Sequence, residues 1–200
     1  MKRNLFLSLI FLGNMSFAND FKFAYVDVSE IFTKSSPAIS LKEALNLKVT
    51  PLQNELKELN DNLTKENEDV NIIQQKNQDV NKLSSKDKSK LLRFQQDKLL
   101  FQQKYMLLQQ KMQKLQDYAS SLLLSKVNDI LKTISEDGNY DLVLTSNQLI
   151  YTKPKYNLTD LVISKLKNID SKNLVKQLND AETKINSEIN LNNNLNINKK

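Results

Sequence analysis

The 200-residue sequence has no Cys, no His and no Trp, and it contains only two Gly and three Pro. Without imidazole or thiol there is no Ser-His or Cys-His nucleophilic pair, and no zinc site of the usual kind, which needs nitrogen or sulfur ligands. The two isolated glycines, Gly13 and Gly138, cannot form a phosphate-cradling loop. A carboxylate pair for hydrolysis stays formally open, but the acidic residues fall mostly on predicted helix surfaces. We therefore expect no enzyme activity, no cofactor and no metal.

The amino terminus has the pattern of an export signal. A charged start precedes an apolar run over residues 5–12, and residues 16–18 form a small-x-small cleavage signature. The pattern predicts a signal peptide over residues 1–18, cleaved between Ala18 and Asn19. No later stretch approaches the apolar length that a membrane-spanning helix needs.

The charge balance is mildly basic. The formal net charge is +6, and it falls to about +4 when the signal peptide with its two basic residues leaves. A lysine-rich surface suits an acidic polypeptide or an anionic membrane, while export argues against nucleic acid as a partner.

Two heptad-patterned stretches, Leu45 to Val80 and Leu91 to Leu122, fill the middle of the sequence. The apolar seam positions of the first stretch are Leu45, Val49, Leu52, Leu56, Leu59, Leu63, Val70, Ile73 and Val80. Those of the second are Leu91, Phe94, Phe101, Tyr105, Leu108, Met112, Leu115, Ala119 and Leu122. Two seams of matched length, joined by a short Ser/Lys-rich break, predict an antiparallel helical hairpin.

The two halves of this predicted hairpin carry opposite charge. Residues 50–81 hold three bases and seven acids, whereas residues 82–132 hold eleven bases and four acids. Opposite charges flanking a shared seam favour pairing, although each exposed pair adds only about 0.2 to 1 kcal/mol. The positive surplus gathers near the tip, so the candidate contact residues for a partner are Lys82, Lys86, Lys88, Lys90 and Arg93.

Several interruptions break the seams. An interior proline removes a hydrogen bond and clashes with the preceding turn, so Pro51 predicts a kink or a helix restart capped by Thr50. Glu66, Asn77 and Lys98 are polar residues at seam positions. We interpret these interruptions as an arm built to bend.

The two ends of the hairpin predict strands. Residues 21–28 are rich in aromatic and branched side chains and read as a strand, followed by a short helix that Asp27 and Glu30 cap. Beyond the helix end at Gly138-Asn139, residues 140–145 and 148–151 predict a β-hairpin.

The predicted fold is therefore α+β, a small β-rich oligomerisation body with a long antiparallel helical-hairpin arm. The body comprises residues 19–35 and 138–167, and the arm residues 36–137 with its tip at about 84–90. Three short strands are too few for an independent sheet, so we expect self-association to complete it. The Asn/Lys-rich tail, residues 168–200, is predicted to be partly helical, to about Ile189, or disordered, above all from 191 onward.

Several short strings in this order resemble the Skp/OmpH family of periplasmic chaperones. The resemblance covers residues 21 to about 167, and the strings that carry it are Ala24-Tyr25-Val26-Asp27, Ile31-Phe32, Ser36-Pro37, Tyr140-Asp141-Leu142-Val143-Leu144, Leu149-Ile150-Tyr151 and Asn157-Leu158-Thr159-Asp160. It implies a homotrimer whose arms enclose a cavity. It also implies an ATP-independent holdase that binds unfolded outer-membrane proteins and prevents their aggregation. Members of the family are also connected with lipopolysaccharide, a further partner implied here without a residue assignment.

Two other functions remain open at this point. A structural or adaptor coiled-coil protein of the cell envelope would use the same helices as a spacer, but a spacer has no need of strand-forming ends. A cytoplasmic nucleic-acid-binding coiled coil would require that the amino terminus is not processed.

Overall fold

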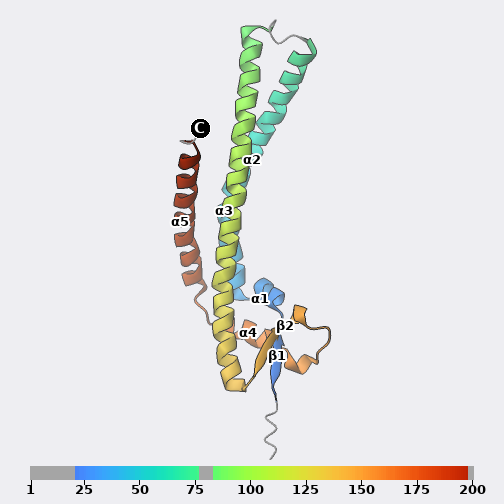
Figure 1. Ribbon diagram of the computed structural model, residues 1–200, viewed down its shortest axis with the longest axis vertical. Helices are drawn as coiled ribbons and strands as arrows, with labels where there is room; N and C mark the ends of the chain where they lie inside the picture. The colour runs from blue at the N-terminus through green and yellow to red at the C-terminus, as the bar shows by residue number, and fades with distance from the viewer. Residues whose placement is uncertain (1–20, 77–82, 198–200) are drawn as a thin grey trace, which may run out of the picture.

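The computed structural model describes residues 21–76 and 83–197. A long helical arm projects from a small body at one end, and a further helix lies beside the lower half of the arm (Figure 1). The predicted signal peptide and its cleavage site at Ala18 and Asn19 lie outside the described residues, as do Lys82 and the seam residues Asn77 and Val80.

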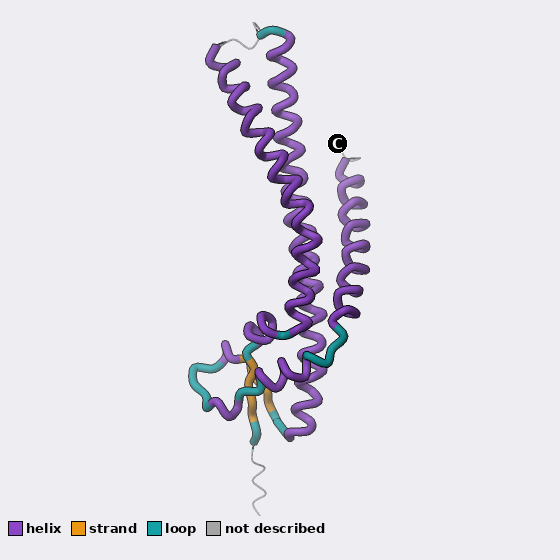
Figure 2. The backbone as a smooth tube through the Cα atoms, turned by 180° about the vertical axis from the view of Figure 1, so that it is seen from behind, coloured by secondary structure: helices purple, strands orange, loops and turns teal. Residues whose placement is uncertain are grey.

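Two short parallel strands form the sheet of the body. Strand β1 (Phe23–Val26) pairs with β2 (Leu142–Thr145) in a register that places Ala24 opposite Val143. Helices α1 (Val28–Lys34) and α4 (Thr159–Leu166) pack beside them (Figure 2). Every second residue of β1 is buried, because successive side chains of a strand point to opposite faces.

A buried threonine joins β1 to α4. The Thr159 hydroxyl accepts a hydrogen bond of 2.8 Å from the Asp27 backbone N–H, and the Leu158 N–H donates to the Tyr25 carbonyl at 2.9 Å. Thr159 is only 1% exposed. These bonds satisfy polar groups that would otherwise be costly to bury, and they fix the start of α4 against the end of β1.

The predicted β-hairpin is wrong. Residues 146–148 form a 3₁₀ turn, η2 (Ser146–Gln148), and a second such turn, η3 (Pro154–Tyr156), follows. The Gln148 side chain accepts a hydrogen bond from the Thr145 N–H at 3.1 Å, which closes the turn before a return strand can form. Within the described residues the body therefore has two strands rather than three, and helices supply most of its packing.

The arm consists of α2 (Ser36–Lys76) and α3 (Ser85–Gly138), which run antiparallel. This confirms the predicted helical hairpin. The buried seam residues of the arm include Leu56, Val70, Ile73, Leu108, Leu115 and Ala119. Tyr105, also a seam residue by its spacing, is instead 46% exposed.

Side chains and backbone geometry set the helix ends. Asp27 caps α1 by accepting from the Glu30 N–H, as predicted, and Ser84 caps α3 by accepting from the Asp87 N–H. At the other end of α3, Asn139 rather than Gly138 adopts the left-handed conformation, with φ 51°. A side chain at Gly138 would meet the Tyr140 ring, since a Cβ there would lie 2.4 Å from it.

Helix α2 continues through Pro51, so the predicted restart is wrong. The Thr50 hydroxyl donates to the Asn46 carbonyl at 2.8 Å, the bond of a residue inside a helix rather than of an N-cap. Pro51 has no N–H for the Leu47 carbonyl, but Leu47 is 77% exposed, so water can serve that carbonyl.

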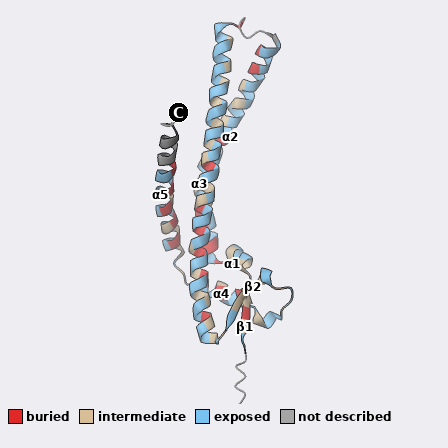
Figure 3. Cartoon of the chain, viewed as in Figure 1, coloured by how far each residue is buried: buried red, intermediate tan, exposed pale blue. Residues whose placement is uncertain are grey.

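Helix α5 (Ser171–Ile197) lies along the lower arm, parallel to α2 and antiparallel to α3 (Figures 1 and 2). Its buried stripe consists of Leu174, Leu178, Ala181, Ile185 and Ile189. Figure 3 shows buried residues on the side of α5 that faces the arm. Helix α5 extends to Ile197, past the predicted limit of about Ile189, and the lower arm is a bundle of three helices.

Candidate binding surface on the helical arm

The structure places the basic tip residues along the first turns of α3. Lys86 and Lys88 are exposed. Lys90 forms an ion pair of 2.8 Å with Asp69 of α2, and Arg93 contacts Glu66 of α2 at 3.3 Å. The hydrogen bond that Lys90 donates to Asp69 raises the pKa of Lys90 above its ordinary value. Part of the tip charge therefore holds the two arm helices together.

Ion pairs between α2 and α3 continue down the arm. Lys104 pairs with Glu55, in addition to the two pairs near the tip. This confirms the prediction that an acidic outgoing helix pairs with a basic returning helix. Glu66, an interruption of the seam, is used in one of these pairs, whereas Lys98 is exposed.

Glutamates of α5 join it to both arm helices. Glu182 pairs with Lys48 of α2 and, at 2.7 Å, with Lys111 of α3. Glu188 pairs with Lys114 of α3 at 2.8 Å. The Lys48, Lys111 and Glu182 side chains are only 14%, 16% and 20% exposed, so this three-membered cluster lies among the packed helices.

Helix α5 is expected to loosen at acidic pH. Burial alone would raise the pKa of Glu182, but hydrogen bonds from Lys111 and Lys48 outweigh it and hold the pKa below its ordinary value of 4.5. A carboxyl whose pKa is lower in the docked state stabilises docking above its ordinary pKa, and that contribution is lost as the pH falls through the docked value. Glu188, whose pKa the Lys114 hydrogen bond lowers, acts in the same direction.

Energy transfer between dyes on engineered cysteines at the exposed positions Ser125 and Asn179 measures this docking. We expect constant transfer from neutral pH down to about 5 and a loss below it. The Glu182→Gln variant keeps the shape of the side chain without the charge, so its transfer should fall less over the acidic range. An equal fall in both proteins would contradict a role for Glu182.

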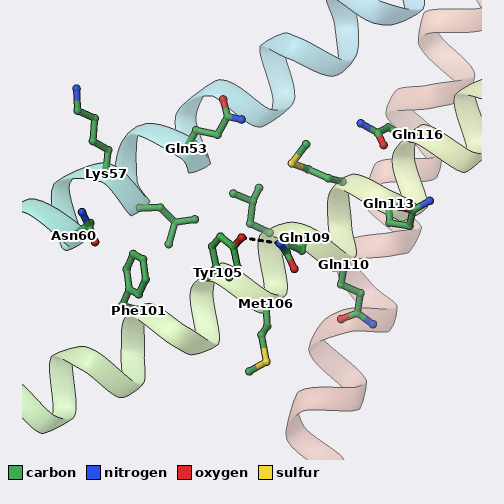
Figure 4. A pocket seen from close by; sticks show the side chains of 13 residues that line it. Gln53, Lys57, Asn60, Phe101, Tyr105, Met106, Gln109, Gln110, Gln113 and Gln116 are labelled. Carbon is green, nitrogen blue, oxygen red and sulfur yellow. Dashed lines mark hydrogen bonds between the residues drawn. The ribbon is translucent and has the colours of Figure 1, made fainter.

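An open groove lies between α2 and α3 at mid-arm (Figure 4). It encloses about 990 Å³. Its lining residues are Gln53, Leu56, Lys57 and Asn60 of α2, and Phe101, Tyr105, Met106, Leu108, Gln109, Gln110, Met112, Gln113 and Gln116 of α3. The lining thus combines apolar and amide side chains with a single charged residue.

Two rings form one end of the groove. Phe101 and Tyr105 lie on successive turns of α3, with ring centres 6.2 Å apart and ring planes 17° from parallel. The Gln109 amide donates a hydrogen bond of 2.8 Å to the Tyr105 hydroxyl, drawn as a dashed line in Figure 4. Met106, beside them, is 62% exposed.

The end of the groove that Tyr105 forms and α5 lie on different sides of α3. An α-helix turns by about 100° per residue, so Lys114, which pairs with α5, lies roughly 180° around the helix from Tyr105, which lines the groove. The arm hairpin therefore has one face covered by α5 over its lower half and another face that carries the groove.

Comparison with known proteins separates the body and the hairpin arm from helix α5. A family profile described as outer membrane protein (OmpH-like) matches residues 22–166, the body and the whole arm. The chain belongs to the OmpH-like family. Helix α5 begins after the OmpH-like match ends, so it lies outside the matched region.

A solved structure supports the OmpH-like fold. A protein of Caulobacter crescentus CB15, described as an OmpH-like outer membrane chaperone, superposes with a TM-score of 0.58 at 14% identity. The alignment covers 74% of this chain and 84% of the other. Among curated proteins, the search found no significant match.

Two negative findings apply to residues 21–76 and 83–197. None of the helices described there combines the length and apolarity needed to cross a bilayer. The same residues bring together no group of acidic side chains that could hold a metal ion.

Sequence reasoning identified the apolar seam but missed the groove and the α5 contacts. Phe101, Tyr105 and Met112 appeared only as seam residues. The signal for the groove was the recurrence of glutamine at 109, 113 and 116, beside those seam residues on one side of α3.

Proposed function

We propose that this OmpH-like protein is an ATP-independent periplasmic holdase that binds unfolded outer-membrane proteins and prevents their aggregation. The observation that carries the proposal is the arm. Its helices of 41 and 54 residues leave large apolar side chains in solvent, among them Leu92, Leu99 and Met106 at 60%, 56% and 62% exposure. Such contacts are weak and tolerant of sequence, as a binder of many unfolded chains requires.

The body supports self-association into the proposed homotrimer. Ile150 and Tyr151, at 107% and 83% exposure, lie just beyond the two-stranded sheet, and Phe21 at its start is 66% exposed. Large apolar side chains that a body leaves in solvent suit an interaction site. A trimer built on this end would project three arms around one cavity.

The predicted export signal supports the periplasmic location in this proposal. The predicted signal peptide would deliver the chain to the periplasm, which has no ATP to drive release, so client capture must rest on reversible contacts. The exposed tip bases Lys86 and Lys88 would attract acidic clients. The same bases suit an anionic membrane surface, including one that contains lipopolysaccharide.

The proposal is tested by diluting a urea-denatured outer-membrane β-barrel protein into buffer with and without this protein, and following light scattering. We expect suppression of scattering near one oligomer per client, because each cavity encloses one chain. Unchanged scattering at a several-fold excess of this protein would contradict the holdase function.

The attraction of clients by the basic tip is tested by the salt dependence of the rate of client capture. Raising the ionic strength from 0.01 to 0.15 M shortens the screening length from about 30 to about 8 Å, so we expect slower client capture. A variant with Lys86→Gln and Lys88→Gln should show less of this salt dependence, while Lys165→Gln with Lys172→Gln removes two exposed charges near the body as a control. An equal salt dependence in all three proteins would contradict steering by the tip.

A further inference from the structure

The groove at mid-arm has a lining suited to a polypeptide backbone. The amide side chains of Gln53, Asn60, Gln109, Gln113 and Gln116 each carry both donors and an acceptor. An extended chain presents N–H and C=O groups along both edges and needs partners of both kinds. Apart from Lys57 the lining carries no charge, so it favours neither an acidic nor a basic ligand.

The apolar part of the lining suits side chains of varied shape. Met106 and Met112 are flexible and polarisable, and methionine adapts to partners of different form. Phe101 and Tyr105 offer ring surface for aromatic or branched side chains. A strand segment of an unfolded β-barrel protein alternates such side chains with polar ones.

The length of the groove limits the length of the extended polypeptide segment that it can hold. Its lining residues on α3 run from Phe101 to Gln116, which corresponds to roughly 23 Å at about 1.5 Å per residue. An extended chain advances about 3.3 Å per residue, so roughly seven residues fill the groove.

Helix α5 covers one face of the lower arm. Its stripe of buried residues and its ion pairs through Glu182 and Glu188 cover the face of α3 that carries Lys111 and Lys114. The groove face remains open beside it.

We propose that this groove is the mid-arm client site, and that it binds an extended segment of about seven residues from an unfolded polypeptide, with the opposite face closed by α5. The inference rests on the proposed holdase function. It differs from steering by the tip, because contacts in a nearly uncharged groove should change little with salt.

Cysteine labelling tests the position of the client directly, since the chain contains no cysteine of its own. We compare two single-cysteine variants of the full chain, Gln109→Cys in the groove and Asn179→Cys on the exposed side of α5. With saturating denatured outer-membrane protein, we expect labelling to slow about tenfold in the Gln109→Cys variant and to change less than about twofold in the other.

Each other outcome has a defined meaning. Equal labelling of the Gln109→Cys variant with and without client, while aggregation is still suppressed, overturns the groove site and leaves the holdase function standing. Failure to suppress aggregation overturns the holdase function itself. Protection that appears without client and grows with protein concentration assigns the groove to a second copy of this chain, and overturns the inference as well.

A matched pair of tyrosines on α3 tests the energetic contribution. Tyr105 lines the groove, whereas Tyr118, with 36% exposure, lies against α5. We expect Tyr105→Ala to weaken client binding about threefold to tenfold at any salt concentration, and Tyr118→Ala to change it less than about twofold. Equal effects of the two substitutions on the client dissociation constant would contradict the assignment.

Discussion

Replacing Leu178 by Asp is expected to release α5 from the arm. Leu178 is fully buried, at 0% exposure, in the middle of the α5 stripe. A carboxylate there would be buried without a partner, at a cost of several kcal/mol, because the nearby lysines Lys48 and Lys111 already pair with Glu182. Once released, an asparagine-rich helix of this length is marginal in water.

Limited trypsin digestion measures the release, since α5 carries lysines at 172, 176 and 184. Cleavage within α5 should be faster in Leu178→Asp than in the original protein by a factor on the order of ten or more. Asn179→Asp introduces the same charge one residue away at an exposed position and should leave the cleavage rate unchanged. Slow cleavage of α5 in the Leu178→Asp variant would show that its docking does not depend on the apolar stripe.

Truncating Leu115 to Ala is expected to destabilise the lower arm by about 2 to 5 kcal/mol, the range for large-to-small substitutions in a core. Leu115 is 0% exposed and belongs to the apolar cluster that the body, the arm and α5 share. The substitution removes apolar contacts and leaves a cavity that rigid neighbouring helices cannot fully close. Urea unfolding followed by the helical circular dichroism signal gives the loss of unfolding free energy.

Leu92→Ala provides the comparison on the same helix. Leu92 is 60% exposed, so its truncation should change the free energy of unfolding by less than about 0.5 kcal/mol. Equal losses from the two substitutions would mean that the packing of the lower arm differs from the structure described here.

Local sequence patterns predicted the parts of the fold that depend on neighbours in the chain. The heptad spacing predicted the antiparallel arm, and the side chain of Asp27 predicted the start of α1. Both signals act over a few residues, so a single sequence contains them. The charge contrast between the two arm helices likewise predicted that they pair through opposite charges, as Lys90 and Asp69 do.

The strand pairing could not be predicted in the same way. β2 pairs in parallel with β1, although more than a hundred residues separate Ala24 from its partner Val143. The local turn at Ser146-Asn147 suggested a hairpin, but the side chain of Gln148 closes that turn on Thr145 instead. Whether β2 pairs with β1 or with residues 148–151 depends on tertiary packing, which local sequence patterns do not contain.

The tail shows how composition can hide a helix. Leu174, Leu178, Ile185 and Ile189 have helical spacing in the sequence, yet the Asn/Lys-rich composition of the tail as a whole favoured only a marginal helix. Packing against α2 and α3, with ion pairs through Glu182, supplies the stability that intrinsic propensity lacks.

The groove was missed in the sequence for a related reason. A seam position is expected to be buried, but Tyr105 remains 46% exposed, and the glutamines beside it belong to no motif. Gln53 and Asn60 of α2 line the groove opposite residues of α3, and this placement depends on how the two helices pack against each other.

The central claim is that several arms of one oligomer hold one unfolded client in solution. The most direct test is the mass of the particle that forms when a denatured outer-membrane protein is diluted into the mature protein, measured by light scattering coupled to size-exclusion chromatography. We expect a soluble complex of three copies of this chain with one client. A monomer of this chain eluting alone, with the client lost to aggregation, would contradict it.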